Sequence, residues 1–300
     1  MQLNHELIPA WVRWQQPEGS EAGWDEAAER LRRQAAQDPD YLKNRLVALD
    51  ETGQIQASLF LSMFQPGVLS FGALRCGPEV AGEVLIELVR QASAHSHSLG
   101  ARLHCRLPAT PQLAPLLAAL PALGAHLSHT RLEFWARLAD LPEEADSPLD
   151  WQAIEPLGPY SLAAAAEILA AAGQGDPDWD PADDPLTLLE SYLADEVLTS
   201  GPECVQIAHV QGQPAGIVIA QVNLSTAWSR ITYMGLLPAF RGQGLGKWIH
   251  RRGFAMLRTQ GGQEYHGGTV QGNTAMEALF RQHGCQLEHS LQEWHWDLPA

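Results

Sequence analysis

The fold is decided by the stretch Leu236-Leu237-Pro238-Ala239-Phe240-Arg241-Gly242-Gln243-Gly244-Leu245-Gly246-Lys247, which follows a strand pattern and precedes a helical one. Glycines at alternate positions allow a tight turn that directs several backbone N–H groups toward one point. The N-terminus of the following helix adds the positive end of its dipole. Arg241 and Lys247 supply full charges on either side, so the turn is suited to bind a pyrophosphate.

Two common nucleotide-binding motifs do not fit this stretch. A dinucleotide fingerprint starting at Gly242 requires glycine where Lys247 stands. A P-loop ending in Gly246-Lys247 requires Ser or Thr in place of Trp248, and glycine in place of Arg241. The sequence therefore excludes both motifs.

The hexapeptide Arg241-Gly242-Gln243-Gly244-Leu245-Gly246 resembles the acetyl-CoA-binding signature of the GCN5-related N-acetyltransferase (GNAT) superfamily, Arg/Gln-x-x-Gly-x-Gly/Ala. Asn273, Leu279 and Gly284 fall at the spacing of the family's downstream segment. The resemblance covers about residues 205–296 and implies transfer of an acetyl group from acetyl-CoA directly to an amine. The alternative is a strand, a turn and a helix with glycines placed by chance.

The resemblance also implies which residues hold acetyl-CoA. Strand 232–237 would bind the pantetheine arm through its backbone, and N–H groups near Leu236 and Leu237 would polarise the thioester carbonyl. The backbone N–H groups of 243–247 would bind the pyrophosphate. The implied set is Leu236, Leu237, Arg241, Gly242, Gln243, Gly244, Leu245, Gly246, Lys247 and Asn273.

The catalytic residues are less well defined, because Phe280 stands where the family usually has the tyrosine that protonates the leaving sulfur. A CoA thiol has a pKa of roughly 8 to 9, so a thiolate can leave without that acid. Tyr265 and His266, on the strand 264–269, and Tyr233 are the candidates for an acid or base. Ordinary sheet packing is the alternative for each of them.

A loop at 173–184 is the candidate acceptor site. Asp176, Asp178 and Asp180 surround Trp179, and this combination could attract a cationic amine and stack against it. The expected acceptor is a primary amine on a polyamine, amino sugar, amino acid or peptide. A solvated surface loop stiffened by proline is the alternative.

The charge distribution agrees with this assignment. The net charge of -16 disfavours nucleic acid and anionic lipid as partners. Residues 151–225 hold 11 acidic and no basic residues, whereas residues 226–300 hold 7 basic and 5 acidic ones. The segment with the glycine-rich turn therefore tolerates an anion, and the segment before it suits a cation.

The sequence also contains a weak internal repeat. Residues 51–57 align with 210–216, 124–129 with 284–289, and 133–135 with 293–295, at offsets of 159 or 160. This predicts two tandem units, 1–145 and 150–300, joined by a polar segment at 141–148. Each unit is expected to be a GNAT-like α/β (α+β) domain, a mixed and mostly antiparallel sheet flanked by helices. Chance similarity is the alternative.

In the second unit, the hydrophobic patterns predict an alternation of helices and strands. Helices are expected at 161–172, 184–196, 245–259 and 274–282, and strands at 204–209, 216–222, 228–237, 264–270 and 292–298. Asp184 is a plausible N-cap before Pro185.

The first unit is predicted to keep the fold without the anion site. In its corresponding turn, at 75–83, the glycine spacing is lost, Pro78 removes a donor, and Glu79 and Glu83 add negative charge. Leu113 stands at the Asn273 position. This unit is expected either to line the acceptor pocket of the second unit or to bury a shared surface.

The remaining expectations concern class and location. Cys76, Cys105, Cys204 and Cys285 form no metal or disulfide pattern, so reduced thiols and no metal are expected. Without a signal sequence or an apolar span, we expect a cytoplasmic monomer or homodimer. The alternative to an enzyme is a protein that binds or senses acyl-CoA without turnover.

Overall fold

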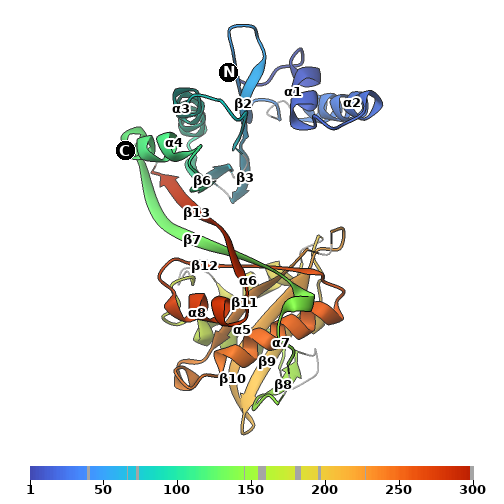
Figure 1. The fold of residues 1–300 in the computed structure, drawn as a ribbon, viewed down its shortest axis with the longest axis vertical. Helices are drawn as coiled ribbons and strands as arrows, with labels where there is room; N and C mark the ends of the chain where they lie inside the picture. Colours follow the sequence, from blue (N-terminus) through green and yellow to red (C-terminus); the bar gives the residue numbers. More distant parts are fainter. Residues whose placement is uncertain are drawn as a thin grey trace. The chain divides into compact units, whose positions relative to one another are not determined.

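The computed structural model describes residues 1–38, 41–65, 67–71, 74–144, 146–154, 160–179, 184–194, 197–226 and 228–297. The chain packs as two compact units. The first comprises Met1–Thr130 with Leu291–Ala300, and the second comprises Arg131–Ser290. Helices and strands alternate in each unit as a mixed α/β fold (Figure 1).

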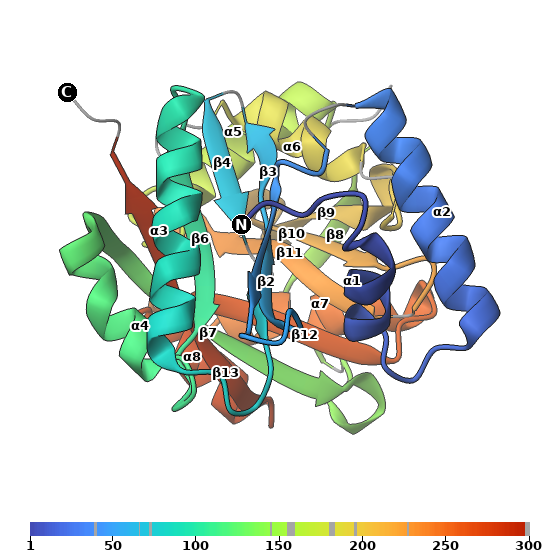
Figure 2. The ribbon, with the colours of Figure 1, turned by 90° about the horizontal axis from the view of Figure 1, so that it is seen from above.

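The first unit begins with two helices and continues into short strands. Its elements are α1 Ile8–Gln15, α2 Glu21–Gln37, β1 Arg45–Leu49, β2 Ile55–Phe60, β3 Ser62–Gln65, β4 Val68–Phe71, β5 Leu74–Cys76, α3 Gly82–Ser98, β6 Arg102–Pro108 and α4 Ala114–Ala119. One core packs around α3 and α4 and a second around α1 and α2. Figure 2 shows these two helix pairs on opposite sides of β2.

The second unit is built around a sheet in the order β12-β11-β10-β9-β8. Its elements are β8 Asp150–Ala153, α5 Leu162–Gly173, α6 Pro185–Leu193, β9 Val205–Val210, β10 Gln213–Val222, β11 Trp228–Leu236, α7 Gly246–Thr259, β12 Glu264–Val270 and α8 Thr274–Gln282. Because side chains alternate along a strand, Ile217 and Ile219 of β10 pack with α5 and α6, while Val218 and Ala220 pack with α7. Both faces of this central strand are therefore buried.

Two long strands, β7 Ala125–Arg137 and β13 Gln286–Trp296, carry the chain between the units. In the second unit, residues 131–137 of β7 pair with β12. In the first unit, residues 291–296 of β13 pair with β6. The division differs from the predicted split into 1–145 and 150–300, because the last strand of the chain completes the sheet of the first unit.

The helices and strands predicted between 161 and 282 are confirmed, with shifts at their ends, and the predicted strand 292–298 corresponds to the end of β13, which lies in the first unit. Strand 264–270 and helix 274–282 match β12 and α8 residue for residue. Thr187 N donates to Asp184 Oδ2 at 2.8 Å, so Asp184 caps α6 as expected. The sequence patterns missed β8 and the first half of β13, because 286–289 lacks an apolar alternation.

Candidate functional site

The strands β11 and β12 separate after a short parallel contact. They pair only at Trp228 with Glu264 and at Ser229 with Tyr265. On its other edge, β11 stays paired with β10 as far as Leu236. After Ser229, β11 has no strand partner among the described residues on the edge that faces away from β10. The backbone N–H and C=O groups on this edge can therefore bind a ligand.

The end of β11 shows which backbone groups are available. Leu237 N–H donates to Ala215 O at 2.9 Å. In antiparallel geometry, this bond directs the N–H and C=O of Leu236 away from β10, and the Leu236 carbonyl accepts from Arg241 Nε at 2.9 Å. Of the two N–H groups expected to polarise a carbonyl, that of Leu237 is thus already bonded in the sheet, and that of Leu236 is directed outward.

The glycine-rich turn has the backbone that the sequence predicts. Gly242 and Gly244 have φ values of +72° and +71°, which residues with a side chain rarely adopt. A Cβ at either position would meet nothing within 4 Å, so conformation and not space requires glycine here. The N–H groups of 242–247 make no hydrogen bond to the described residues, in part because the first turn of a helix has no internal acceptors for them.

A cavity of about 600 Å³ lies between this turn, the end of β11 and α8. Eight of the ten predicted acetyl-CoA residues line it; Leu237 and Gln243 are not among its lining residues. The eight are Leu236, Arg241, Gly242, Gly244, Leu245, Gly246, Lys247 and Asn273. The structure therefore brings together residues that the sequence spreads over 38 positions.

Arg241 lies at the cavity wall, but its donors are engaged with backbone carbonyls. Its guanidinium donates to Gln174 O at 2.6 Å and to Ala172 O at 2.7 Å, in addition to the bond to Leu236 O. The last carbonyls of a helix have no hydrogen-bond donors within the helix, and at the end of α5 Arg241 provides these donors. This residue fixes the loop after α5 against the turn, a role that the sequence did not indicate.

Among the described residues of the acceptor loop, Asp176 is the acidic one that lines the cavity. Burial is the main cause that raises the pKa of its carboxyl, and it outweighs the hydrogen bond from the backbone N–H of Asp178, which lowers the pKa. Tyr233 lies beside it, and burial followed by the Asp176 charge raises the pKa of the Tyr233 hydroxyl. That hydroxyl is buried without a hydrogen bond of ordinary geometry to the described residues.

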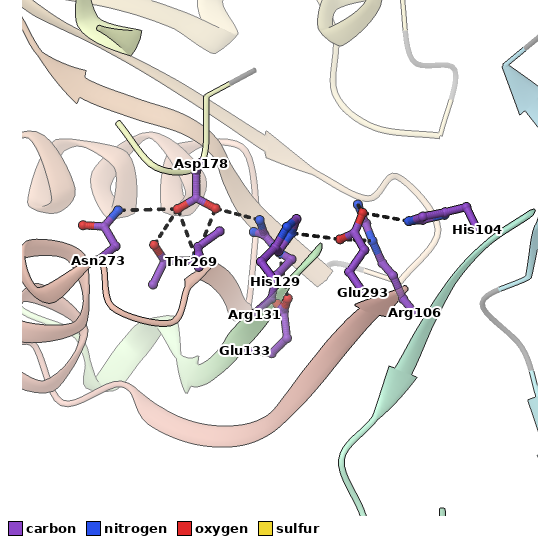
Figure 3. A network of polar contacts seen from close by, with 10 residues as sticks. His104, Arg106, His129, Arg131, Glu133, Asp178, Thr269, Asn273 and Glu293 are labelled. Carbon is purple, nitrogen blue, oxygen red and sulfur yellow. Dashed lines mark hydrogen bonds and ion pairs between the residues drawn. The ribbon is translucent and has the colours of Figure 1, made fainter. Parts of the chain in front are cut away.

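Asp178 instead joins the loop to neighbouring strands (Figure 3). Its carboxylate accepts from Arg131 Nη1 at 2.7 Å, from Thr269 Oγ1 at 2.6 Å and from Val270 N at 3.1 Å, and Asn273 Nδ2 lies at 3.5 Å. The side chain is 20% exposed. These bonds favour a structural role for Asp178 over the predicted contact with an amine.

The other two predicted acceptor residues differ in status. The Trp179 ring lies over Gly173, where a Cβ would come within 2.3 Å of it, and makes an edge contact with the Tyr233 ring at 5.9 Å. Trp179 therefore packs one face of its ring against the end of α5. Asp180 lies outside the described residues.

Tyr265 points into the core and is not among the residues that line the cavity. It is 1% exposed, and its ring packs near Phe254 and Phe280. Its hydroxyl is 3.0 Å from His250 Nε2, and His250 Nδ1 is 3.0 Å from His283 Nδ1. Burial raises the pKa of Tyr265 far above its usual value and lowers the pKa of His283 to about 4, so both groups are neutral near pH 7. The packing favours the structural alternative for Tyr265.

His266 projects from the opposite face of β12. Its ring lies 5.4 Å from that of Trp228, and its two nitrogens are 3.7 and 3.8 Å from carboxylate oxygens of Glu264 and Glu288. The side chain is 23% exposed, but its Nε2 is buried and has no hydrogen-bond partner among the described residues. His266 remains a candidate, although it does not line the cavity beside the turn.

Asn273 and Phe280 belong to the segment downstream of the glycine-rich turn that has the spacing of the family. Asn273 lines the cavity and caps α8, because its Oδ1 accepts from Met276 N at 3.3 Å. Phe280 is 1% exposed and stacks on Phe134 with 4.3 Å between ring centroids. The position of the usual tyrosine is therefore occupied by a core residue.

Several contributors to the site carried no signal in the sequence. Gly235 is one, because a Cβ there would lie 2.9 Å from the Tyr233 hydroxyl. Arg131 is another, since it anchors Asp178 from β7 and lies outside the region of family resemblance. Isolated Gly and Arg residues occur throughout the sequence, and only the folded chain shows that these two support the loop.

The first unit has a separate polar cluster centred on Glu293 (Figure 3). His104 Nε2 lies 2.7 Å, Arg106 Nε 3.0 Å and His129 Nε2 3.1 Å from its carboxylate. Burial raises the pKa of Glu293, but the hydrogen bonds from His104 and Arg106 outweigh it and lower the pKa to about 2. The cluster thus joins β6, β7 and β13 within this unit.

Comparison with solved structures shows the class of fold. A GCN5-related N-acetyltransferase from Sphaerobacter thermophilus is similar with a TM-score of 0.67 at 17% identity, covering 98% of this chain and 93% of that one. A tandem GNAT protein from the clavulanic acid biosynthesis pathway has a TM-score of 0.51 at 14% identity and covers 98% and 97%. The fold is therefore that of a tandem GNAT protein. No curated protein matches the chain in sequence.

The sequence comparison locates the family's domain. Residues 162–285 match the model of the acetyltransferase (GNAT) family. The matched segment lies entirely within the second unit. The predicted resemblance and fold class are confirmed.

Further findings concern the chain as a whole. All four cysteines are free, and Cys105, Cys204 and Cys285 are buried. In the part of the chain that the structure describes, no helix is long and apolar enough to cross a membrane. In the same part, no group of three or more His, Cys, Asp or Glu could hold a metal ion.

Proposed function

We propose that the second unit is an N-acetyltransferase that binds acetyl-CoA and transfers its acetyl group directly to an amine. The observation that carries this proposal is the cavity between the glycine-rich turn, the end of β11 and α8, with the run of backbone N–H groups at 242–247 that have no described partner. Lys247 at the same wall adds a positive charge for the phosphates. The open edge of β11 offers partners for the amide groups of the pantetheine arm.

The reaction requires little from the side chains. A neutral amine nitrogen forms a bond to the acetyl carbonyl carbon, the C–S bond breaks, and CoA leaves as a thiolate. The outward N–H of Leu236 can stabilise the negative charge that develops on the carbonyl oxygen. Since an alkyl thiol has a pKa of about 8.5, the absence of a tyrosine at Phe280 does not prevent this departure.

Asp176 is the group that we assign to receive the proton of the amine, because it lines the cavity and its carboxyl has a raised pKa. In Asp176→Asn we expect kcat to fall about 100-fold, with acetyl-CoA affinity nearly unchanged. In the wild type, the rate should fall on the acid side with a pKa above the ordinary 3.8 of an aspartate, and in Asp176→Asn this fall should disappear. Asp184→Asn is the control, since Asn caps α6 as well as Asp does. An unchanged profile in Asp176→Asn would remove this residue from the mechanism.

The proposed activity is tested by two measurements on the full chain. Calorimetry should show binding of acetyl-CoA, and an assay for free thiol should show its release in the presence of an amine from a panel of polyamines, amino sugars, amino acids and peptides. The panel includes the matching alcohols, which should release no thiol. Absence of acetyl-CoA binding would reject the donor assignment.

A second candidate is a protein that senses acyl-CoA without turnover. Two observations favour it: Phe280 occupies the usual tyrosine position, and Tyr265 is buried in the core away from the cavity. Binding of acetyl-CoA without thiol release on any amine of the panel supports this candidate over the enzyme.

A further inference from the structure

A second cavity, of about 400 Å³, lies in the first unit between α1, α2 and the start of β1. Three arginines line it, Arg30, Arg45 and Arg75, whereas no carboxylate is among its described lining residues. This is unexpected in a chain with a net charge of -16. Among the described residues, the charged groups that line this cavity are therefore all cationic.

Arg45 is the unusual member of the three. It is 6% exposed, and its guanidinium carbon lies over the rings of Tyr41 and Phe60, at 3.8 and 4.2 Å from their centroids. Its Nη1 donates to Tyr41 O at 2.6 Å, and its buried Nε has no partner. Among the described residues, no carboxylate lies within ion-pair distance of it.

A buried cation without a counter-charge is costly, because burial removes the water that stabilises it. The two aromatic rings offset part of that cost by cation–π attraction, but they supply no negative charge. Desolvation is also the main cause that lowers the pKa of Arg45. An anion in the adjoining cavity would supply the missing charge.

The other lining groups narrow the chemistry of that anion. Trp11 Nε1 is a second buried donor without a partner, and Val12, Ala27 and Leu31 give the cavity apolar surface. A single buried planar cation beside apolar walls matches one carboxylate on an apolar body. A phosphate is more strongly hydrated and would need more donors.

We propose that the first unit binds a small organic monocarboxylate in the cavity between α1 and α2, with Arg45 as its counter-cation. Arg30 and Arg75 are exposed at the same cavity and attract the anion toward it. This site is distinct from the acetyl-CoA site, since all of its residues lie in the first unit. It gives that unit a binding function of its own.

The test uses benzoate as the probe and benzamide as its neutral counterpart, titrated into the full chain. The readout is the indole N–H signal of Trp11 in ¹H–¹⁵N spectra, assigned with Trp11→Phe. We expect benzoate to shift this signal with a dissociation constant in the millimolar range or tighter. Benzamide should bind at least about tenfold more weakly than benzoate. The indole signal of Trp248, in the second unit, should not move.

Two variants and a control locate the site. Arg45→Met should weaken benzoate binding about tenfold or more. Because that variant also loses the packing of Arg45, Ala27→Leu provides a second test that fills the cavity and retains the cation, and it should abolish the shift. Arg32 lies on α2, as Ala27 does, but it does not line the cavity. Arg32→Gln should therefore bind benzoate as the wild type does.

The outcomes that overturn the proposal are equally specific. They are no shift with benzoate at concentrations where Trp11 is visible, equal affinity for benzoate and benzamide, or full affinity in both Arg45→Met and Ala27→Leu. Binding of inorganic phosphate in preference to benzoate would also overturn it.

Discussion

The helices α7 and α3 follow equivalent strand-to-helix turns, and the two turns differ in what they leave open. Before α7, Gly242 and Gly244 have positive φ, and the N–H groups of 242–247 have no described partner. Before α3, Val80 N–H bonds to Gly77 O, and Gln112 donates to the same carbonyl. The turn before α3 thus bonds Val80 N–H within the protein, whereas the turn before α7 leaves all the N–H groups of 242–247 without a described partner.

The strands that lead to the two turns pair in a similar but not identical way. In the first unit, β4 pairs with β6 in parallel and the following strand β5 pairs with β2. In the second unit, β11 pairs with β12 in parallel at its start and with β10 as far as Leu236. Pro115 packs against Gly82 at the start of α3, so that a Cβ added to Gly82 would lie 2.7 Å from the Pro115 Cβ. The comparison shows that the two units both place a parallel strand pair before the turn and differ in the turn itself.

The largest effect is expected from breaking the open turn. Gly244→Val forces a β-branched residue to a φ of +71°, so the turn must change shape and its N–H groups must diverge. We expect acetyl-CoA affinity to fall about 100-fold or more in calorimetry. Gly212→Val is the control: its φ is +76°, it also has open space around it, and it lies in the hairpin between β9 and β10. Equal loss of affinity in both variants would attribute the effect to general instability.

The Glu293 cluster tests whether the first unit depends on polar contacts of its own. The pKa of Glu293 is about 2 against an ordinary value of 4.5, so its stabilisation is fully present above pH 4.5 and is lost as pH falls toward 2. Glu293→Gln should lower the free energy of unfolding by about 2–3 kcal/mol at pH 7, and the two curves should converge near pH 2. The exposed Glu87→Gln, on α3 of the same unit, should cost no more than about 0.5 kcal/mol. Parallel pH curves would contradict the assignment.

A smaller loss of stability is expected at the clamp that holds the open turn. Arg241→Met removes the donors to Ala172 O, Gln174 O and Leu236 O, and should lower the free energy of unfolding by about 2 kcal/mol in urea. Arg281→Met, which removes an exposed i,i+4 pair with Glu277, should cost about 0.5 kcal/mol or less. If both variants have the same stability, the clamp does not contribute.

The glycine-rich turn was predictable from the sequence, because its chemistry depends on backbone conformation and on residues close together in the chain. The helices and strands of the second unit followed from hydrophobic periodicity for the same reason. The roles of Asp178 and Tyr265 were not predictable, because each depends on partners far away in the sequence: Arg131 and Thr269 for Asp178, and His250 for Tyr265. Residue type alone does not distinguish an acidic loop that binds an amine from one that ties two strands together.

The smallest effect separates the charge of the open turn from its shape. Lys247 Nζ and Arg251 Cζ lie 5.2 and 5.1 Å from the ring of the same tryptophan, Trp248, but only Lys247 lines the cavity. Lys247→Gln should weaken acetyl-CoA binding about tenfold at low salt and by less at high salt, since salt screens the lost attraction. Arg251→Gln should change affinity by less than about twofold, because its charge is screened outside the cavity. If the two variants lose equal affinity for acetyl-CoA, the charges along the whole helix α7 attract the phosphates, and the position of Lys247 has no special role. The backbone N–H groups alone would then distinguish the turn before α7 from the turn before α3.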